Sequence, residues 1–218
     1  MNKYIDHTLL KQNSTKQQID TLLQEAITHQ FKSVCVNPYW ISYCKKALQG
    51  TGVLVCTVIG FPLGANTTAT KVFEAVNAIE NGAQEVDMVL NIGALIDGDY
   101  EYVTNEIKLI KEACKETCLK VIIETCLLTD EQKEMACKAV VEAKADFVKT
   151  STGFSTSGAT VSDVALMKRV VKDDCFIKAA GGVRNVQDLH DMIEAGANRI
   201  GTSSGVKLMQ NEEGTTNY

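Results

Sequence analysis

Two lysines and one aspartate in this chain carry side chains that could do chemistry together. Lys149 is the third residue of the run FVKT, Lys178 the third of FIKA and Asp87 the third of EVDMVL. Side chains alternate between the two faces of a strand, so apolar neighbours on one face leave these three on the other. A neutral lysine amine can form an imine that accepts the electrons of a broken carbon–carbon bond, and a carboxylate can move the protons.

For each residue taken alone, a structural role is the simpler interpretation. A single strand lysine usually keeps its charged end in solvent, and an aspartate often serves only as its salt-bridge partner. Both lysines together fit this interpretation poorly, because their neighbours place them on the inner face and a buried ammonium is costly. The pattern therefore favours a catalytic set, in which Asp87 can also neutralise a lysine.

The elements that must position these residues alternate along the whole chain. Short β-branched runs predict strands over 4–8, 33–36, 53–59, 85–90, 120–124, 147–150, 176–179 and 199–201. Amphipathic segments predict helices over 15–29, 68–81, 100–117, 130–143, 162–171 and 186–195. Ser14 with Gln17 fits a capping box for the first helix, and Gly82 and Gly196 fit helix ends.

Eight strand–helix units in a chain of 218 residues predict a single (β/α)₈ TIM barrel, an α/β fold. A doubly wound open sheet is the alternative, but it would usually carry GxGxxG after its first strand, and this sequence does not. No Pro/Gly/Ser-rich linker divides the chain. We therefore expect one barrel domain over residues 1–210, followed by a polar tail over 211–218.

Glycine-rich segments follow three of the predicted strands. They are Ser151-Thr152-Gly153, Gly181-Gly182-Val183-Arg184 and Gly201-Thr202-Ser203-Ser204-Gly205. In TIM barrels the loops after the seventh and eighth strands commonly form a phosphate site, because glycines let backbone N–H groups approach an anion. Each loop alone could simply close a tight turn. Two of them in the expected places predict phosphate binding, with Ser203 and Ser204 as added hydroxyl donors.

Composition limits the partners and cofactors of the protein. The net charge is −5 and no basic run is present, which argues against nucleic acid or an anionic membrane surface as a partner. The eight cysteines form no CxxC pair, and no signal peptide or membrane span is recognised, which favours a cytoplasmic protein with reduced, buried thiols. The three histidines show no metal-ligand spacing, so we expect neither a metal nor a cofactor.

Over nearly its whole length the sequence resembles the deoxyribose-phosphate aldolase family of class I, Schiff-base aldolases. The matching segments are YIDHT at 4–8, VCVNP at 34–38, GFPLG at 60–64, EVDMV at 85–89, VIIET at 121–125, KTSTG at 149–153 and KAAGGVR at 178–184. The resemblance implies a barrel that reversibly cleaves 2-deoxy-D-ribose 5-phosphate to D-glyceraldehyde 3-phosphate and acetaldehyde. It implies no metal or cofactor, and a place in deoxyribonucleoside catabolism.

The resemblance also implies roles for residues that match the family's motifs. Lys149 matches the Schiff-base lysine, Lys178 the lysine that perturbs it and Asp87 the aspartate of the proton relay. Asp6 and Cys35 match residues that line the substrate site. The phosphate-binding positions are Gly153, Gly181, Gly182, Ser203 and Ser204. Some members use a tyrosine at the end of a flexible tail for proton transfer, and this chain ends in Tyr218 after a short tail that does not align securely.

An imine-forming lysine must be neutral at pH 7, whereas free lysine, with a pKa of about 10.4, is neutral in roughly one molecule in a few thousand. Side chains on adjacent parallel strands bring two ammonium groups about 6 Å apart, where they repel by about 3 kcal/mol at an effective dielectric of about 20. Desolvation in the barrel acts in the same direction. We therefore expect Lys178 to favour the neutral amine of Lys149.

Two other functions stay open from the sequence. One is a transaldolase-like Schiff-base enzyme that acts on a different sugar phosphate, which the KTSTG and KxxGGVR pair argues against. The other is a non-catalytic sugar-phosphate sensor, which would be expected to have lost a lysine or Asp87. The protein could also form a homo-oligomer.

Overall fold

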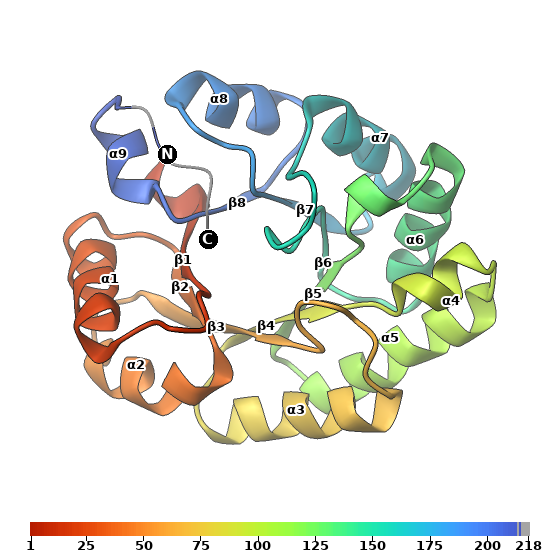
Figure 1. Cartoon of the computed structure of the whole chain (residues 1–218), viewed down its shortest axis with the longest axis horizontal. Coiled ribbons are helices and arrows are strands. Elements are labelled where there is room, and N and C mark those ends of the chain that lie inside the picture. Colours follow the sequence, from red (N-terminus) through yellow and green to blue (C-terminus); the bar gives the residue numbers. More distant parts are fainter. Residues whose placement is uncertain (213, 215–218) are drawn as a thin grey trace.

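A computed structural model describes residues 1–212 and 214 and shows a closed barrel of eight parallel strands (Figure 1). The strands are β1 (Ile5–Leu9), β2 (Ser33–Val36), β3 (Leu54–Ile59), β4 (Glu85–Val89), β5 (Cys118–Ile122), β6 (Phe147–Lys149), β7 (Phe176–Ala180) and β8 (Arg199–Thr202). They pair in chain order, and β8 pairs with β1 to close the sheet. The predicted TIM barrel is confirmed, and the strand ends differ from the prediction by at most two residues.

Helices surround the barrel (Figure 1). They are α1 (Lys16–Thr28), α2 (Ile41–Ala47), α3 (Thr68–Glu80), α4 (Ile92–Ile96), α5 (Tyr100–Cys114), α6 (Asp130–Glu142), α7 (Val161–Val171), α8 (Val186–Glu194) and α9 (Gly205–Met209), with short 3₁₀ turns at Asn2–Tyr4, Pro38–Trp40 and Thr125–Leu127. The six predicted helices are confirmed, with ends shifted by at most three residues. The sequence did not predict α2, α4 and α9, because five to seven residues are too few to show a helical period.

The start of α1 corrects the predicted capping box by one residue. Thr15, not Ser14, is the N-cap: its hydroxyl accepts from the Gln18 N–H at 3.4 Å, and the Gln18 side chain accepts from the Thr15 N–H at 2.8 Å. The Ser14 hydroxyl instead donates to the Lys11 carbonyl. The predicted helix ends are confirmed, since Gly82 and Gly196 follow α3 and α8 with φ of 107° and 119°.

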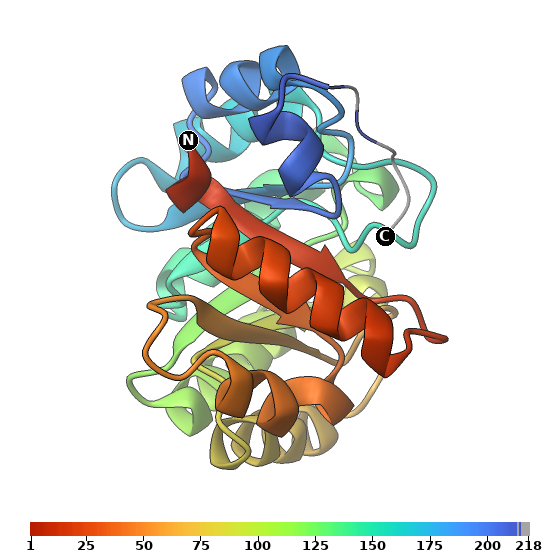
Figure 2. The same ribbon diagram turned by 90° about the vertical axis from the view of Figure 1, so that its left-hand side faces the viewer.

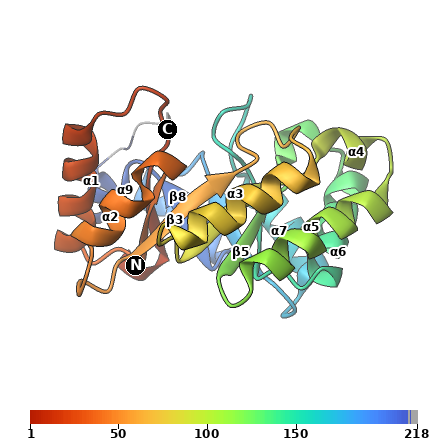
Figure 3. The same ribbon diagram turned by 90° about the horizontal axis from the view of Figure 1, so that it is seen from below.

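The main apolar core lies between the barrel and the surrounding helices. Figure 2 shows α1 along the outside of β1, and Figure 3 shows α3 beside α5. Val86 and Met88 of β4 are fully buried in this core. A buried ion pair, Lys71 Nζ to Glu106 Oε1 at 2.8 Å, joins α3 to α5. The outward-facing apolar residues of the strands therefore hold the helices, as the alternation predicts.

The inside of the barrel is largely charged, whereas branched apolar residues usually fill such barrels. Its buried ionisable residues are Asp6, Glu85, Asp87, Lys120, Lys149, Lys178 and Arg199. Near the N-terminal ends of the strands, Phe147 lies against this charged interior: its ring centroid is 5.9 Å from Lys120 Nζ and 5.5 Å from Arg199 Cζ. A buried charged group is unfavourable unless an opposite charge compensates it or the protein uses it for function, so this charged interior is a candidate site.

Three further predictions concern the cysteines, the membrane and the tail. Six of the eight cysteines are buried, and Cys118 and Cys126 are partly exposed. In the described part of the chain, no helix has the length and apolar character needed to cross a bilayer. Residues 213 and 215–218, which include Tyr218 and most of the predicted tail at 211–218, lie outside the described residues.

Candidate active site

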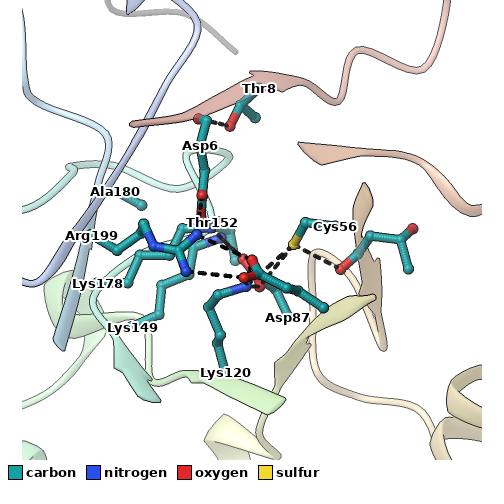
Figure 4. Close-up of polar contacts among 12 residues, drawn as sticks. Asp6, Thr8, Cys56, Asp87, Lys120, Lys149, Thr152, Lys178, Ala180 and Arg199 are labelled. Atoms are coloured by element: carbon teal, nitrogen blue, oxygen red, sulfur yellow. Dashed lines mark hydrogen bonds and ion pairs between the residues drawn. The ribbon is translucent and has the colours of Figure 1, made fainter. Parts of the chain in front are cut away.

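Asp87, Lys149 and Lys178 meet inside the barrel (Figure 4). Lys149 and Lys178 are directly paired positions on β6 and β7, so their side chains leave the sheet side by side. Each ammonium lies 2.8 Å from the same oxygen, Oδ2 of Asp87 on β4. The strand alternation thus brings the three predicted residues to one point, with a single carboxylate oxygen between two lysines.

A second layer of charges lies nearer the N-terminal ends of the strands. Lys120 Nζ contacts Asp87 Oδ1 at 2.9 Å and Glu85 Oε2 at 2.7 Å, and Arg199 Nη2 contacts Glu85 Oε1 at 3.0 Å. Lys120, Glu85 and Arg199 are not among the residues that the sequence predicts for the site. A signal was present: Lys120 stands between Leu119 and Val121, which are both fully buried, as Lys149 stands between apolar neighbours.

Asp6 belongs to this ionic cluster as a counter-ion. It is fully buried, with Oδ2 2.7 Å from Lys178 Nζ and Oδ1 2.7 Å from the donating Ser33 hydroxyl. Arg199 also pairs with Oδ1. All these contacts lie within the barrel, so the predicted contact of Asp6 with substrate stays a prediction.

Among the described residues that these ion pairs join, there is one more cation than anion. Lys120, Lys149, Lys178 and Arg199 face the carboxylates of Asp6, Glu85 and Asp87, four positive groups against three negative ones. In a buried site an uncompensated charge is unfavourable, so the loss of one lysine proton would balance the cluster. The charge count alone does not say which lysine loses it.

The surroundings of the three lysines differ. Burial acts to lower the pKa of Lys178 and of Lys120, but nearby carboxylates outweigh it and hold both pKa values well above the usual range. Within residues 1–212 and 214, Lys149 has a single ion-pair partner, whereas Lys120 and Lys178 each have two. The Lys149 side chain is 4% exposed and the other two are 0% exposed. Lys149 is therefore the least buried and least paired of the three lysines, which makes it the one most accessible to a substrate.

Asp87 is held as a carboxylate. Burial acts to raise its pKa, but Lys120, Lys149 and Lys178 outweigh this effect and keep the pKa well below the usual range. Its oxygens accept hydrogen bonds from these lysines and from the Cys56 thiol at 3.1 Å. An ionised carboxylate beside Lys149 is suited to accept a proton from the amine or from a bound intermediate.

Cys35 and Cys56 are directly paired positions on β2 and β3, and both are fully buried. Hydrogen bonding with Cys56 lowers the pKa of Cys35, while burial raises the pKa of Cys56. The two sulfurs and an Asp87 oxygen lie within 4.8 Å of one another, close enough to hold a cation. The excess positive charge of the surrounding cluster opposes a divalent ion there.

We expect Cys35→Ala to lower kcat/KM by less than about tenfold, since the change removes one sulfur from a packed wall and leaves the lysines and Asp87 in place. Steady-state kinetics on the purified variant measure this directly. A loss as large as that caused by replacing Lys149 would place the thiol among the reacting groups.

Two of the three glycine-rich segments, those after β6 and β7, line a polar cavity of about 380 Å³ at the C-terminal ends of these strands, whereas the segment after β8 does not. Gly153, Gly181 and Gly182 line it, and all three have a positive φ that favours glycine. A Cβ on Gly182 would lie 2.8 Å from the Ala159 carbonyl oxygen, so the loop also needs glycine for space. Arg184 supplies a positive charge to the same cavity.

Ser203 and Ser204 follow β8 and are not part of this cavity wall. Ser204 is buried, and a Cβ on Gly214 would lie 2.5 Å from its Cβ. Their predicted contact with phosphate stays a prediction.

An aldolase, an enzyme that makes or breaks carbon–carbon bonds, is the class to which such a barrel and site point. The sequence model of the DeoC/LacD family of aldolases matches residues 1–211. The chain belongs to this family.

Relatives named deoxyribose-phosphate aldolase are similar over their full length. The chain is 61% identical over 212 residues to the one from Streptococcus uberis, covering 97% of this chain and 96% of the relative. It is 58% identical over 218 residues to deoxyribose-phosphate aldolase 1 of Mesoplasma florum, covering 100% and 99%.

Solved structures share the fold. The aldolase QR15 matches with a TM-score of 0.92 and 42% identity, covering 96% of this chain and 94% of that one. The deoxyribose phosphate aldolase of Aeropyrum pernix, described as a unique tetramer, matches with a TM-score of 0.86 and 33% identity, covering 96% and 89%.

Proposed function

We propose that this chain is a deoxyribose-phosphate aldolase in which Lys149 forms the Schiff base. It cleaves 2-deoxy-D-ribose 5-phosphate reversibly to D-glyceraldehyde 3-phosphate and acetaldehyde, in deoxyribonucleoside catabolism. The observation that carries this proposal is the meeting of Lys149 and Lys178 on one oxygen of Asp87, next to a glycine-lined polar cavity. The full-length similarity to relatives of that name supports the choice of substrate.

The reaction begins when the neutral amine of Lys149 attacks the C1 aldehyde of the substrate. Asp87, directly or through water, moves the amine proton to the former aldehyde oxygen, which gives a carbinolamine; with one further proton from solvent its hydroxyl leaves as water and an iminium ion remains. The C3 hydroxyl then gives its proton to water by way of Asp87, and the electrons of the C2–C3 bond flow into the iminium as that bond breaks. Glyceraldehyde 3-phosphate leaves, C2 of the remaining enamine takes a proton from water, and the iminium so formed is hydrolysed to acetaldehyde and the free amine of Lys149.

The charge count of the cluster favours these steps. With Lys149 as ammonium or as iminium the cluster carries one excess positive charge, and with Lys149 as amine or as enamine it is balanced. Bond cleavage converts the iminium to the enamine and so removes the excess charge from a buried site. Groups placed in advance to favour the charge change of the reaction are a main source of catalysis.

The phosphate group is the second point of attachment. The cavity lined by Gly153, Gly181, Gly182 and Arg184 begins four residues after Lys149, so a phosphate held there leaves the aldehyde end of the sugar to reach the amine. Ser203 and Ser204 follow the neighbouring strand and would add donors. Asp6 and Cys35 shape the inner wall in this proposal.

Borohydride trapping with acetaldehyde, followed by peptide mass mapping, tests the proposal. We expect a single reduced adduct on the peptide that contains Lys149. An adduct on the Lys178 or Lys120 peptide would reverse the assignment of the nucleophile. A panel of sugar phosphates separates this activity from a transaldolase-like one.

Activity is expected to survive a chelator, because the reaction proposed here uses an amine as the electron sink and needs no metal. Turnover measured before and after treatment with EDTA checks this. Complete loss of turnover that added zinc restores would count decisively against the lysine mechanism.

We further propose that the enzyme works in the cytoplasm as a homo-oligomer that needs neither nucleic acid nor a membrane. The net charge of −5 and the tetramer described for the Aeropyrum pernix relative support this. Light scattering of the purified protein measures the number of subunits.

A further inference from the structure

Glu124, two residues after β5, has a backbone conformation that its residue type rarely adopts. Its φ of 54° and ψ of 65° lie in the left-handed region, which is unfavourable for any residue with a Cβ other than asparagine or aspartate. The strand predicted over 120–124 ends at Ile122 before this turn. Unfavourable backbone conformations persist where the surrounding structure holds them, and they are concentrated at functional sites.

The turn directs the carboxylate of Glu124 into the loop that follows Lys149. The Thr152 N–H donates to Oε1 at 3.2 Å, and the Thr152 hydroxyl donates to Oε2. The same hydroxyl accepts from the Phe154 N–H at 3.0 Å. Glu124 and Thr152 are only 2% and 1% exposed, so these hydrogen bonds are shielded from water.

The backbone on either side of Glu124 holds the same segment. The Ile123 N–H donates to the Lys149 carbonyl at 3.0 Å, and the Thr125 N–H donates to the Thr150 carbonyl at 2.9 Å. Ile123, Thr125 and Glu124 therefore bind Lys149, Thr150 and Thr152, respectively. The nucleophile stands at the start of this segment, and Gly153 of the phosphate cavity stands directly after it.

We infer that Glu124 is a positioning residue for the aldol reaction. By binding Thr152 it fixes the distance between the Lys149 amine and the phosphate cavity, so that a sugar phosphate bound at one end presents its aldehyde to the other. This inference rests on the proposed function and adds to it a residue that does not touch the reacting atoms. Burial raises the pKa of this carboxyl, and Thr152 opposes that effect by hydrogen bonding to the ionised form.

The experiment compares Glu124→Ala and Glu124→Gln with a matched control, Asp146→Ala. Asp146 also joins β5 to β6, since its Oδ2 accepts from the Leu119 N–H at 2.8 Å and pairs with Lys111, but it does so at the opposite end of the barrel. For each variant, KM and kcat are measured with 2-deoxyribose 5-phosphate and with unphosphorylated 2-deoxyribose. The rate of acetaldehyde trapping at Lys149 and the melting temperature are measured as well.

For Glu124→Ala we expect the preference in kcat/KM for the phosphorylated substrate to fall by at least about tenfold, mainly through KM, because a small misplacement of the two ends removes the advantage of joint binding. Trapping of acetaldehyde, which has no phosphate, should stay within about threefold of wild type. The preference of Glu124→Gln for the phosphorylated substrate should lie between those of wild type and Glu124→Ala, since its amide oxygen can still accept a hydrogen bond from Thr152. Asp146→Ala should keep the wild-type preference.

An unchanged preference in Glu124→Ala, with only a lower melting temperature, would overturn the inference and leave Glu124 as a structural residue. If Glu124→Ala does not fold, Glu124→Gln takes its place: an unchanged ratio of kcat/KM between the phosphorylated and unphosphorylated substrates would likewise overturn the inference. Failure of the proposed function shows itself separately, because wild-type protein would then give no trapped adduct on Lys149.

Discussion

Lys149→Leu is expected to abolish both turnover and the borohydride-trapped adduct with acetaldehyde. Leucine fills much of the space of the lysine stem but has no amine, so neither carbinolamine nor iminium can form. The other two lysines of the cluster, Lys120 and Lys178, are paired by two carboxylates each and are fully buried, so neither is open to the substrate in place of Lys149. Turnover of the sugar phosphate and mass mapping of the reduced protein test this.

The matched variant is Lys178→Leu, which should act through the charge state of Lys149. Without Lys178 the cluster is balanced only when Lys149 keeps its proton, and Lys149 no longer shares Asp87 Oδ2 with a second cation. A repulsion of about 3 kcal/mol corresponds to about a hundredfold lower fraction of neutral amine. Turnover should therefore fall by about that factor at pH 7.

The pH profile separates this electrostatic role from others. The fraction of neutral amine rises with pH, so the activity of Lys178→Leu should recover in part as the pH is raised, until the fold fails. Lys178→Arg keeps the positive charge, so its turnover should show no such dependence on raised pH. Trapped adduct should still appear on the Lys149 peptide. No recovery at high pH would mean that Lys178 acts by another route, such as contact with the substrate.

Asp87→Asn is the second change with a large expected effect. The amide has nearly the shape of the carboxylate but cannot accept a proton, so turnover should fall by roughly 10²–10⁴-fold, as for the loss of a general base. The asparagine side chain also places an NH₂ group where Asp87 has a second oxygen. That group faces the cationic nitrogens of the neighbouring lysines without a negative charge to compensate them, which should lower the melting temperature. Steady-state kinetics and thermal unfolding measure the two effects separately.

Asp6→Asn is the control for this prediction. Asp6 is as deeply buried as Asp87 and pairs with Lys178 and Arg199, but Lys149 has no ion pair with it. It should lower stability comparably and turnover much less. An Asp87→Asn enzyme with near wild-type kcat would reduce Asp87 to a structural counter-ion.

The amino-acid sequence by itself determined the barrel and the inward direction of the three central residues. Both depend on local patterns. Strand–helix alternation sets the fold class, and the two-residue period of a strand sends Asp87, Lys149 and Lys178 to the face opposite their apolar neighbours. The glycine-rich segments after β6 and β7 were visible in the sequence in the same way, and the structure adds that Gly153, Gly181 and Gly182 have a positive φ.

Only the tertiary structure decided which charges share one site and which lysine is free to react. Lys120 and Arg199 come from β5 and β8, and the stagger of strands in a closed barrel, which no single segment encodes, brings both to Glu85 of β4 and brings Lys120 to Asp87 as well. The excess of one positive charge follows from that assembly. The left-handed turn at Glu124 is likewise decided by its partner, because Thr152 lies 28 residues away and only the pairing of β5 with β6 brings it near.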